Sequence, residues 1–340
     1  TANLVIQASG ISLFSDFVVG EVCNPASIGN WTGLSNSIWT NPDNWQCGIL
    51  PVGTTSVLIA SGLLNYPLIN SGTVSVNNLT IQSGAILTVN GAELQVAGTL
   101  SGSGFLDATN ASVVFNGASL QTINGGMFVT GTANNLYINN PSGASLTGSL
   151  NITGILKVDQ GAFNSGGNLT IISSPFQTAL IDGSGTGEIL GNVTMQRYLP
   201  SGYGYKYFSS PFQSATVNEF ADDLDLLASF PSFYRYDENL SSSGWVAYTD
   251  PAGILAPLSG YAANFGSDAV PKTIDITGEV NNHNQTISLS NNNRPFTLGF
   301  NLVGNPYPSP IDWDATVGWS RVNVEDAIYF FDASSTDYYG

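Results

Sequence analysis

Apolar and polar residues alternate in short runs along most of this chain, and the runs end at Gly, Asn or Ser. Alternation over three to five residues is typical of β-strands with one buried face, and Gly or Asn readily adopts the backbone turn needed at a corner. The clearest alternating pairs are Leu79/Ile81, Leu87/Val89, Leu94/Val96 and Leu136/Ile138. The pattern predicts an all-β protein.

Residues 57–197 are predicted to form a parallel β-solenoid, or β-helix. The element Asn-Leu-Thr/Tyr-Ile recurs there at Asn78, Asn135 and Asn168, with spacings of 57 and 33 residues. Strands this short, with few hairpin-type turns, favour coils that bury their inward residues against the coils above and below. A sandwich of short antiparallel strands is the alternative.

Helical periodicity occurs in one place, residues 217–230. Val217, Phe220, Leu224 and Leu227 are spaced as on one face of a helix, which predicts a short surface helix.

Residues 198–340 are richer in aromatic residues and are predicted to form a β-sandwich with an internal repeat. Aligning Pro211 with Pro306, an offset of 95 residues, also aligns 233–237 with 328–332. In the first copy a further strand follows at 244–248, whereas the second copy reaches Gly340 at that point. We therefore interpret the chain as truncated within a repeat unit, a piece of a longer polypeptide.

The N-terminal part divides into two predicted segments. Residues 1–22 alternate as strands do, and we expect them to end a preceding domain, or to be an edge strand given to the cap or to a neighbouring molecule. Residues 23–56 are rich in tryptophan, and we expect Trp31, Trp39 and Trp45 to close the open end of the solenoid.

The two cysteines, Cys23 and Cys47, flank this tryptophan-rich segment. A disulfide between them would stabilise the fold by roughly 3 kcal/mol, and the extracellular character of the chain favours it. The alternative is a pair of free buried thiols.

Charge limits the classes of partner. Only 9% of residues are charged, and 24 acids against 7 bases give a formal net charge of −17. Such a charge repels nucleic acid and anionic membrane surfaces, and no apolar run is long enough for membrane insertion. The composition suits a secreted or cell-surface protein.

The segment from Gly29 to Gly62 resembles a module of large secreted, adhesin-like proteins of the Bacteroidetes. The shared pattern is a Trp-x-Gly opening, a Trp-Thr-Asn-Pro-x-Asn-Trp core at 39–45, and Pro51 before a Val-x-Ile strand. The stretches GYAANF at 260–265 and GFNLVGNPYPSPIDW at 299–313 resemble the C-terminal region of the same proteins.

In that family such regions lie upstream of a C-terminal sorting domain for type IX secretion, so the resemblance implies export by that route. The chain differs from the family pattern in having Phe300 where Trp is usual, and residues 1–340 include no sorting domain.

No catalytic grouping is apparent, and no catalytic residue or cofactor is predicted. A polysaccharide lyase needs a basic residue, and Lys157 is the only one between 57 and 196. A glycosidase needs two opposed carboxylates, but the acids of this region are scattered along the sequence. These acids are Glu93, Asp107, Asp159, Asp182 and Glu188. The single histidine, His283, lies in a polar turn and offers no zinc-ligand spacing.

Two groups of residues remain candidates for binding. Asp222, Asp223 and Asp225 could ligate Ca²⁺, although acids near the start of a short helix also favour its dipole. Trp245, Tyr248 and Tyr261, with Tyr203 and Tyr205 nearby, could stack on sugar rings, although a small β-sandwich needs such residues for its core.

Together these features predict a non-enzymatic extracellular protein, a structural or adhesive segment of a large modular surface protein that could self-assemble into a fibre or surface layer. Its expected partners are other domains of the same long chain, identical subunits or surface glycans. The alternative is a carbohydrate-binding module that uses exposed aromatics. The third hypothesis is a polysaccharide lyase or hydrolase on the solenoid.

Overall fold

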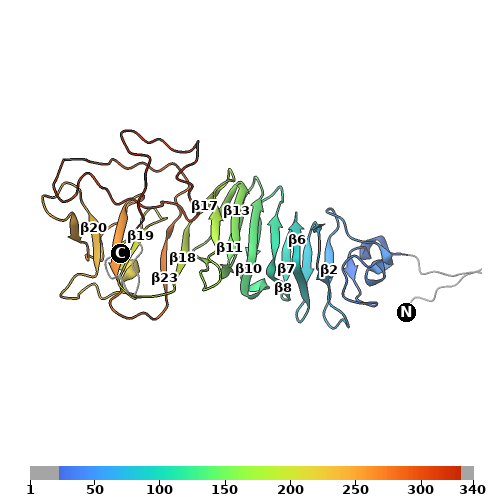
Figure 1. The fold of residues 1–340 in the computed structure, drawn as a ribbon. Helices are drawn as coiled ribbons and strands as arrows, with labels where there is room; N and C mark the ends of the chain where they lie inside the picture. The colour runs from blue at the N-terminus through green and yellow to red at the C-terminus, as the bar shows by residue number, and fades with distance from the viewer. Residues whose placement is uncertain (1–22, 331–340) are drawn as a thin grey trace, which may run out of the picture.

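The computed structural model describes residues 23–330 of the 340-residue chain. Figure 1 shows an elongated all-β molecule, with a small N-terminal cap, a stack of coils and a wider C-terminal region. The described part contains strands and short 3₁₀ turns but no α-helix. The predicted all-β fold with a parallel β-solenoid is confirmed, with about 7 turns.

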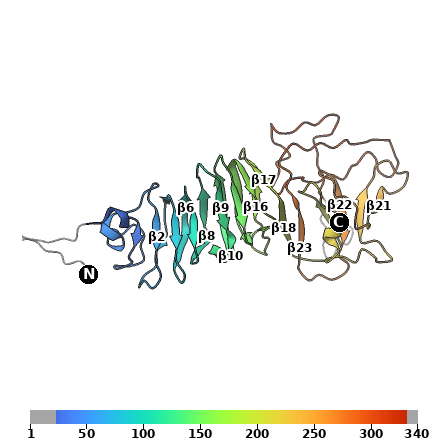
Figure 2. The same cartoon turned by 180° about the vertical axis from the view of Figure 1, so that it is seen from behind.

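The solenoid is built from two sheets of short parallel strands and one large sheet (Figure 2). The first short-strand sheet contains β1 (Asn30–Trp31), β2 (Val57–Ile59), β5 (Leu79–Ile81) and β7 (Leu100–Gly102). The second contains β9 (Gln121–Asn124), β11 (Ala144–Thr147), β14 (Ala162–Asn164) and β17 (Glu188–Leu190).

The large sheet joins the remaining strands of every coil. Its parallel strands are β3 (Leu68–Ile69), β4 (Thr73–Val76), β6 (Ile86–Val96), β8 (Phe105–Phe115), β10 (Phe128–Asn139), β12 (Leu150–Ile152), β13 (Ile155–Gln160), β15 (Leu169–Ile171), β16 (Leu180–Asp182) and β18 (Asn192–Leu199). The antiparallel strand β23 (Lys272–Glu279) completes it.

Three strands of the large sheet are longer than the sequence pattern predicts. β6 and β8 have 11 residues each and β10 has 12, against the three to five expected. Each bends at a register shift instead of ending, for example around Asn90 where β6 pairs with β8. Gly91, with φ of 66°, supplies the backbone conformation for that bend. One strand therefore serves two sides of the coil.

The alternating apolar residues point into a continuous core, as predicted. Leu79, Ile81, Leu87 and Leu94 are fully buried, and Leu136 and Ile138 continue the same rows in later coils. Because each coil packs on its neighbours, burial of these rows is the main force that holds the stack together.

Two of the three recurring Asn-Leu elements, at Asn78 and Asn135, mark corners where one coil binds the next. Asn78 Oδ1 accepts a hydrogen bond from the Thr99 amide at 2.8 Å, and Asn135 Oδ1 accepts one from the Ile155 amide at 2.8 Å. Gly98 and Gly154 lie against these asparagines, and a Cβ atom at either glycine would collide with the Asn side chain. The motif is thus a structural hydrogen-bonding device.

The tryptophan-rich segment packs against the first coil. Trp31, Trp39 and Trp45 are 2%, 4% and 3% exposed, and the Trp39 and Trp45 ring centroids lie 4.6 Å apart. Trp31 forms an isolated β-bridge with Trp45, and the Trp39 main-chain amide donates to the carbonyl of Leu68 at 3.1 Å. The edges of β1 and β3 are therefore occupied by the cap itself.

The C-terminal end of the solenoid is closed on all its sides. β23 pairs antiparallel with β18 along eight residues. The Asn282 side chain bonds the main chain of Ile189 in β17, and the Ile181 amide of β16 donates to the carbonyl of Pro308 at 3.1 Å. The solenoid and the C-terminal region thus share one sheet, and the domain boundary expected at residue 197 falls inside β18.

The C-terminal region contains a four-stranded antiparallel sheet in the order β19 (Tyr205–Ser209), β22 (Gly260–Asn264), β20 (Phe233–Tyr236) and β21 (Trp245–Ala247). Phe208, Phe220 and Phe233 pack beneath it, with ring centroids about 5 Å apart. Residues 281–330 contain no strand, so the predicted β-sandwich has one regular sheet of its own within the described residues.

The predicted repeat therefore does not give two equivalent folds in residues 23–330. Its two proline turns meet at Asn281, whose amide donates to the Pro211 carbonyl at 3.1 Å and whose Nδ2 donates to the Pro306 carbonyl at 2.8 Å. The first copy forms β19, whereas Val303 of the second forms only an isolated bridge with Ser259.

The prediction of a helix over residues 217–230 was wrong beyond the first turn. Only the 3₁₀ turn Val217–Phe220 forms, and Leu227 is 91% exposed. Asp225 accepts a hydrogen bond from the Leu227 amide at 2.9 Å, an alternative to helical bonding that short acidic side chains favour.

Candidate functional site

The two cysteines of the sequence form a disulfide. The Cα atoms of Cys23 and Cys47 are 5.4 Å apart, and the bridge closes a loop of 24 residues around the tryptophan cluster. A stable disulfide indicates an oxidising compartment. Its role here is structural, because it fixes the start of the described chain to the cap.

The structure does not assemble the proposed Ca²⁺ ligands into a site. Asp222 and Asp225 are exposed, and Asp225 is engaged by the Leu227 amide. In residues 23–330 no group of three or more acidic, His or Cys side chains is arranged to hold a metal ion.

Asp223 is nevertheless electrostatically unusual. Partial burial is the largest cause that raises its pKa to about 6; the neighbouring carboxylates of Asp222 and Asp275 contribute to the rise, and Lys272 opposes it. Its Oδ2 is buried without a hydrogen-bond partner. The same burial and Asp222 raise the pKa of Asp275. Asp223 and Asp275 therefore favour the protonated, uncharged form. Protonation at low pH weakens their attraction for a cation.

The aromatic candidates separate into core and surface residues. Tyr261 is only 4% exposed and stacks on Phe233, so it belongs to the core and cannot stack on a sugar. Tyr248 is half-buried, stacks on Tyr261, and donates its hydroxyl to the Ile254 carbonyl at 2.9 Å. Trp245 is half-buried and contacts Tyr236, with ring centroids 5.1 Å apart. It is the best remaining candidate for stacking.

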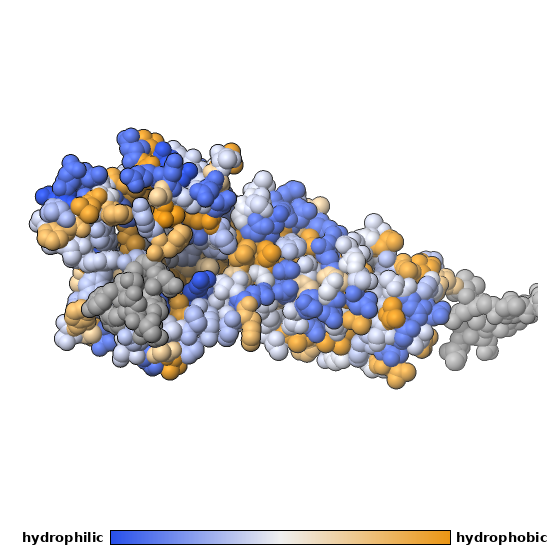
Figure 3. All heavy atoms as spheres, viewed as in Figure 1, coloured by the Kyte–Doolittle hydropathy of each residue, from blue (hydrophilic) through white to orange (hydrophobic). Residues whose placement is uncertain are grey.

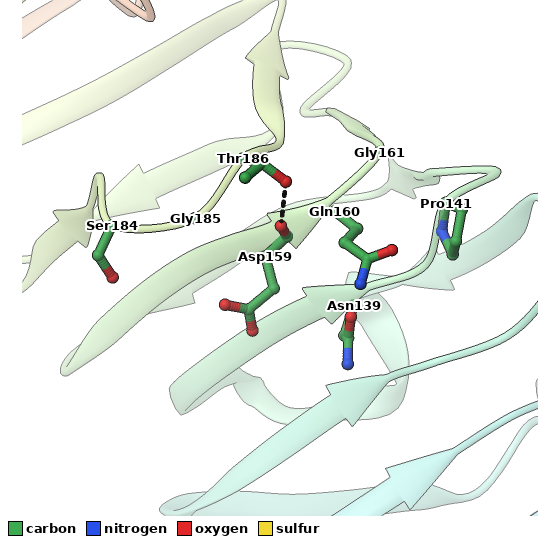
Figure 4. Close-up of a pocket in the computed structure, with 8 residues that line it drawn as sticks. All are labelled: Asn139, Pro141, Asp159, Gln160, Gly161, Ser184, Gly185 and Thr186. Carbon is green, nitrogen blue, oxygen red and sulfur yellow. Dashed lines mark hydrogen bonds between the residues drawn. The ribbon is translucent and has the colours of Figure 1, made fainter.

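A shallow polar groove of about 610 Å³ lies on the side of the solenoid (Figure 4). Three successive coils contribute to it, through the end of β10, the end of β13, and the loop that follows β16. Its lining residues are Asn139, Pro141, Asp159, Gln160, Gly161, Ser184, Gly185 and Thr186. In Figure 4 the side chains of Asn139, Asp159 and Ser184 project toward the same side.

Main-chain contacts hold the groove in shape. Thr186 donates both its amide, at 3.0 Å, and its hydroxyl, at 2.8 Å, to the carbonyl of Asp159. A Cβ atom at Gly185 would overlap the carbonyl of Val158, so only glycine permits the two coils to approach this closely. Hydrogen bonds between adjacent coils therefore fix the positions of the lining residues.

The one basic residue beside the groove is paired with neighbouring acids. Lys157 Nζ lies 2.8 Å from Asp159 Oδ1, and this hydrogen bond raises the pKa of Lys157. Lys157 is also in register with Asp182, whose pKa is lowered by hydrogen bonds from Ser184. The basic residue that the lyase hypothesis requires is therefore ion-paired and protonated, which makes it a poor proton acceptor.

Sequence reasoning missed the groove because its residues are common corner residues. Asn139 and Gln160 come from coils 21 residues apart in the sequence, and their pairing depends on a register shift at the end of β10.

A shared SSPFQ pentapeptide at 173–177 and 209–213 was also missed. Phe212 is fully buried in its copy, whereas Phe176 is 96% exposed.

Comparison with known proteins identifies the family but no activity. The model of a domain of unknown function (DUF8693) matches residues 30–117 and 103–338. These matches cover well over half of the chain, so the chain belongs to this family. The second match extends from the solenoid into the C-terminal region. No curated protein and no solved structure matches the chain.

The structure also bears on membrane insertion. Within the described residues, no helix has the length and apolar character needed to cross a bilayer.

Proposed function

We propose that this chain is a non-enzymatic structural segment of an extracellular protein, a stiff rod that separates neighbouring parts of a longer polypeptide. The supporting observation is the closed solenoid. Its core continues from Trp31 in the cap to Val193 in β18, and the edge strands at both ends already have hydrogen-bond partners. Such a stack resists bending because every coil is bonded to the next.

The extracellular location is part of the proposal. The disulfide between Cys23 and Cys47 supports an oxidising environment. Although only 9% of the residues are charged, the net charge of −17 favours solubility. The resemblance to large secreted proteins of the Bacteroidetes motivates a place at the cell surface, with other domains of the same chain as partners.

Closure of the ends makes a discrete rod a better proposal than a fibre grown by stacking coils. A stacking fibre needs free strand edges at both ends. The other route to self-assembly, donation of residues 1–22 as a strand, lies outside the described residues.

A carbohydrate-binding module remains the second proposal, because Trp245 has a partly exposed ring beside Tyr236. It is weaker than the rod proposal, since Tyr261 is unavailable and Tyr248 is tied by its hydroxyl. A glycan array with wild-type and Trp245→Ala protein tests it. Saturable binding that the variant loses would establish it.

Single-molecule pulling tests the rod directly. Successive coils begin at Leu79 and Leu100, so one coil holds 21 residues and releases about 7 nm when it unravels. We expect resistance to force followed by unravelling in steps of one or a few coils. Extension of residues 57–197 at low force without such steps would contradict a mechanical role.

A further inference from the structure

We propose that the polar groove at Asn139, Gln160 and Ser184 binds short neutral saccharides through their neighbouring hydroxyl groups. This binding function is independent of the rod proposed above, and either can fail without the other. It is also distinct from stacking on Trp245, which lies on the separate antiparallel sheet.

The groove presents planar hydrogen-bonding groups at a regular spacing. Asn139 and Gln160 are paired in register on adjacent strands, β10 and β13, and both side chains are exposed. Ser184 and Thr186 come from the next coil. Because coils in a parallel sheet lie about 4.8 Å apart, the three coils span roughly 10 Å, which is the length of about two linked sugar rings.

The two groove amides differ from the amides that build the solenoid. Asn78 and Asn135 bond the adjacent coil, and Gln121 is buried and bonds two carbonyls. The side chains of Asn139 and Gln160 make no hydrogen bond to any residue between 23 and 330. Each amide thus offers two donors and an acceptor to a ligand, as the paired hydroxyls of a sugar require.

The local charge selects a neutral ligand. Lys157 carries one positive charge against the two carboxylates of Asp159 and Asp182, so the ladder beside the groove has a net charge of −1. An acidic sugar would be repelled by this excess and by the net charge of the whole chain. A bare cation would have to compete with Lys157 for Asp159.

Asp159 has hydrogen-bonding capacity left after its ion pair. Lys157 contacts one carboxylate oxygen, Oδ1, and the Asp159 side chain is 35% exposed at the groove. Its Oδ2 can accept a hydrogen bond from a sugar hydroxyl, and this charge-assisted hydrogen bond is stronger than one between neutral groups. Tyr137, in register with Lys157 and half-buried, places an aromatic ring beside this position.

The shape of the groove predicts weak binding. It is shallow and open to solvent, so a ligand there loses little water and buries little apolar surface. We expect a dissociation constant in the millimolar range, on the order of 1 mM. Such binding gains strength when several copies act together on a polysaccharide.

The test uses the whole chain and saturation-transfer NMR with neutral trisaccharides, α- and β-linked glucans as the first probes and oligogalacturonate as the acidic comparison. The variant Asn139→Ala/Gln160→Ala removes both groove amides. The matched control is Asn70→Ala, an exposed amide that follows β3 on another coil, and Trp245→Ala reports on the aromatic candidate. Thermal unfolding of each variant confirms that the fold is retained.

We expect saturable binding of at least one neutral trisaccharide, weakened at least tenfold in the double variant and unchanged in Asn70→Ala and Trp245→Ala. Absence of saturable binding to neutral sugars would overturn the proposal. Undiminished binding in the double variant, loss of binding in Trp245→Ala, or binding of oligogalacturonate alone would overturn it as well.

Discussion

Asn282 forms two hydrogen bonds with the main chain of Ile189, accepting from its amide at 3.0 Å and donating to its carbonyl at 2.8 Å. β17 is the last strand of its sheet, and a single side-chain amide thereby takes the place of the next strand on its outer edge. Together with β23 on β18, it removes the free strand edges that lead to association between sheets. Figure 3 shows a mixed polar and apolar exterior along the rod.

Replacing Asn282 by alanine should destabilise this end of the solenoid. The variant leaves the amide and carbonyl of the buried Ile189 without partners, which costs about 1–3 kcal/mol. Hydrogen exchange at Ile189 should accelerate with the loss of local stability. Gln285→Ala, which changes a partly exposed amide in the same segment that bonds only the nearby His283 carbonyl, serves as the control. Equal exchange in both variants would show that Asn282 does not close the edge.

The disulfide should stabilise the cap more than the rest of the chain. Closing a loop of 24 residues stabilises a fold by about 3 kcal/mol in the chain-entropy description. We expect reduction, or the double substitution Cys23→Ser/Cys47→Ser, to lower the unfolding temperature of the first coils. The double variant should not respond to reductant. A wild-type melting curve that reductant leaves unchanged would contradict this role.

The tryptophan cluster should be essential to the first coils. Trp45 is 3% exposed, packs against Trp31 and Trp39, and donates its indole N–H to the Trp39 carbonyl at 2.7 Å. Trp45→Ala should cost about 3–5 kcal/mol and expose the β1 edge. Limited proteolysis should then cut the N-terminal coils while residues beyond β10 stay protected. Uniform resistance would count against the proposed cap.

Stability should fall as the pH rises through the range in which Asp223 ionises. Its folded pKa of about 6 lies above the ordinary 3.8, so the folded state favours the protonated carboxyl. This contribution is complete below pH 3.8 and is lost as the pH rises through 6.

Asp223→Asn should remove this dependence and stabilise the protein at pH 7 by about 1 kcal/mol, after allowance for solvent screening. Urea unfolding between pH 4 and 7 measures the effect, with the exposed Asp43→Asn at the other end as control. A variant that keeps the wild-type pH dependence would refute the assignment.

Much of the solenoid could be predicted because its signals are local. Alternating pairs such as Leu79/Ile81 face the core, and the glycines and asparagines between them turn the corners. The long strands were not predicted because residues such as Asn90 and Gly91 usually indicate the end of a strand. In the structure β6 bends at these residues, and its hydrogen-bond ladder with β8 continues beyond them.

The candidate site was harder to predict because it depends on distant contacts. Asn139 and Gln160 become neighbours only through the register of β10 on β13. The sequence left both sugar stacking and core packing open for Tyr261, because an aromatic residue in a strand has the same sequence signal on either face of the sheet. Its burial follows from packing against Phe233 and Tyr248, which the sequence pattern does not specify.

Sedimentation velocity tests the central claim, that both ends of the solenoid are closed so that the chain forms a discrete rod. The comparison is between the wild type and a variant that carries Trp45→Ala at one end and Asn282→Ala at the other. We predict an elongated monomer for the wild type at all concentrations, and concentration-dependent association for the doubly opened variant. Association of the wild type that the two substitutions leave unchanged would contradict the account.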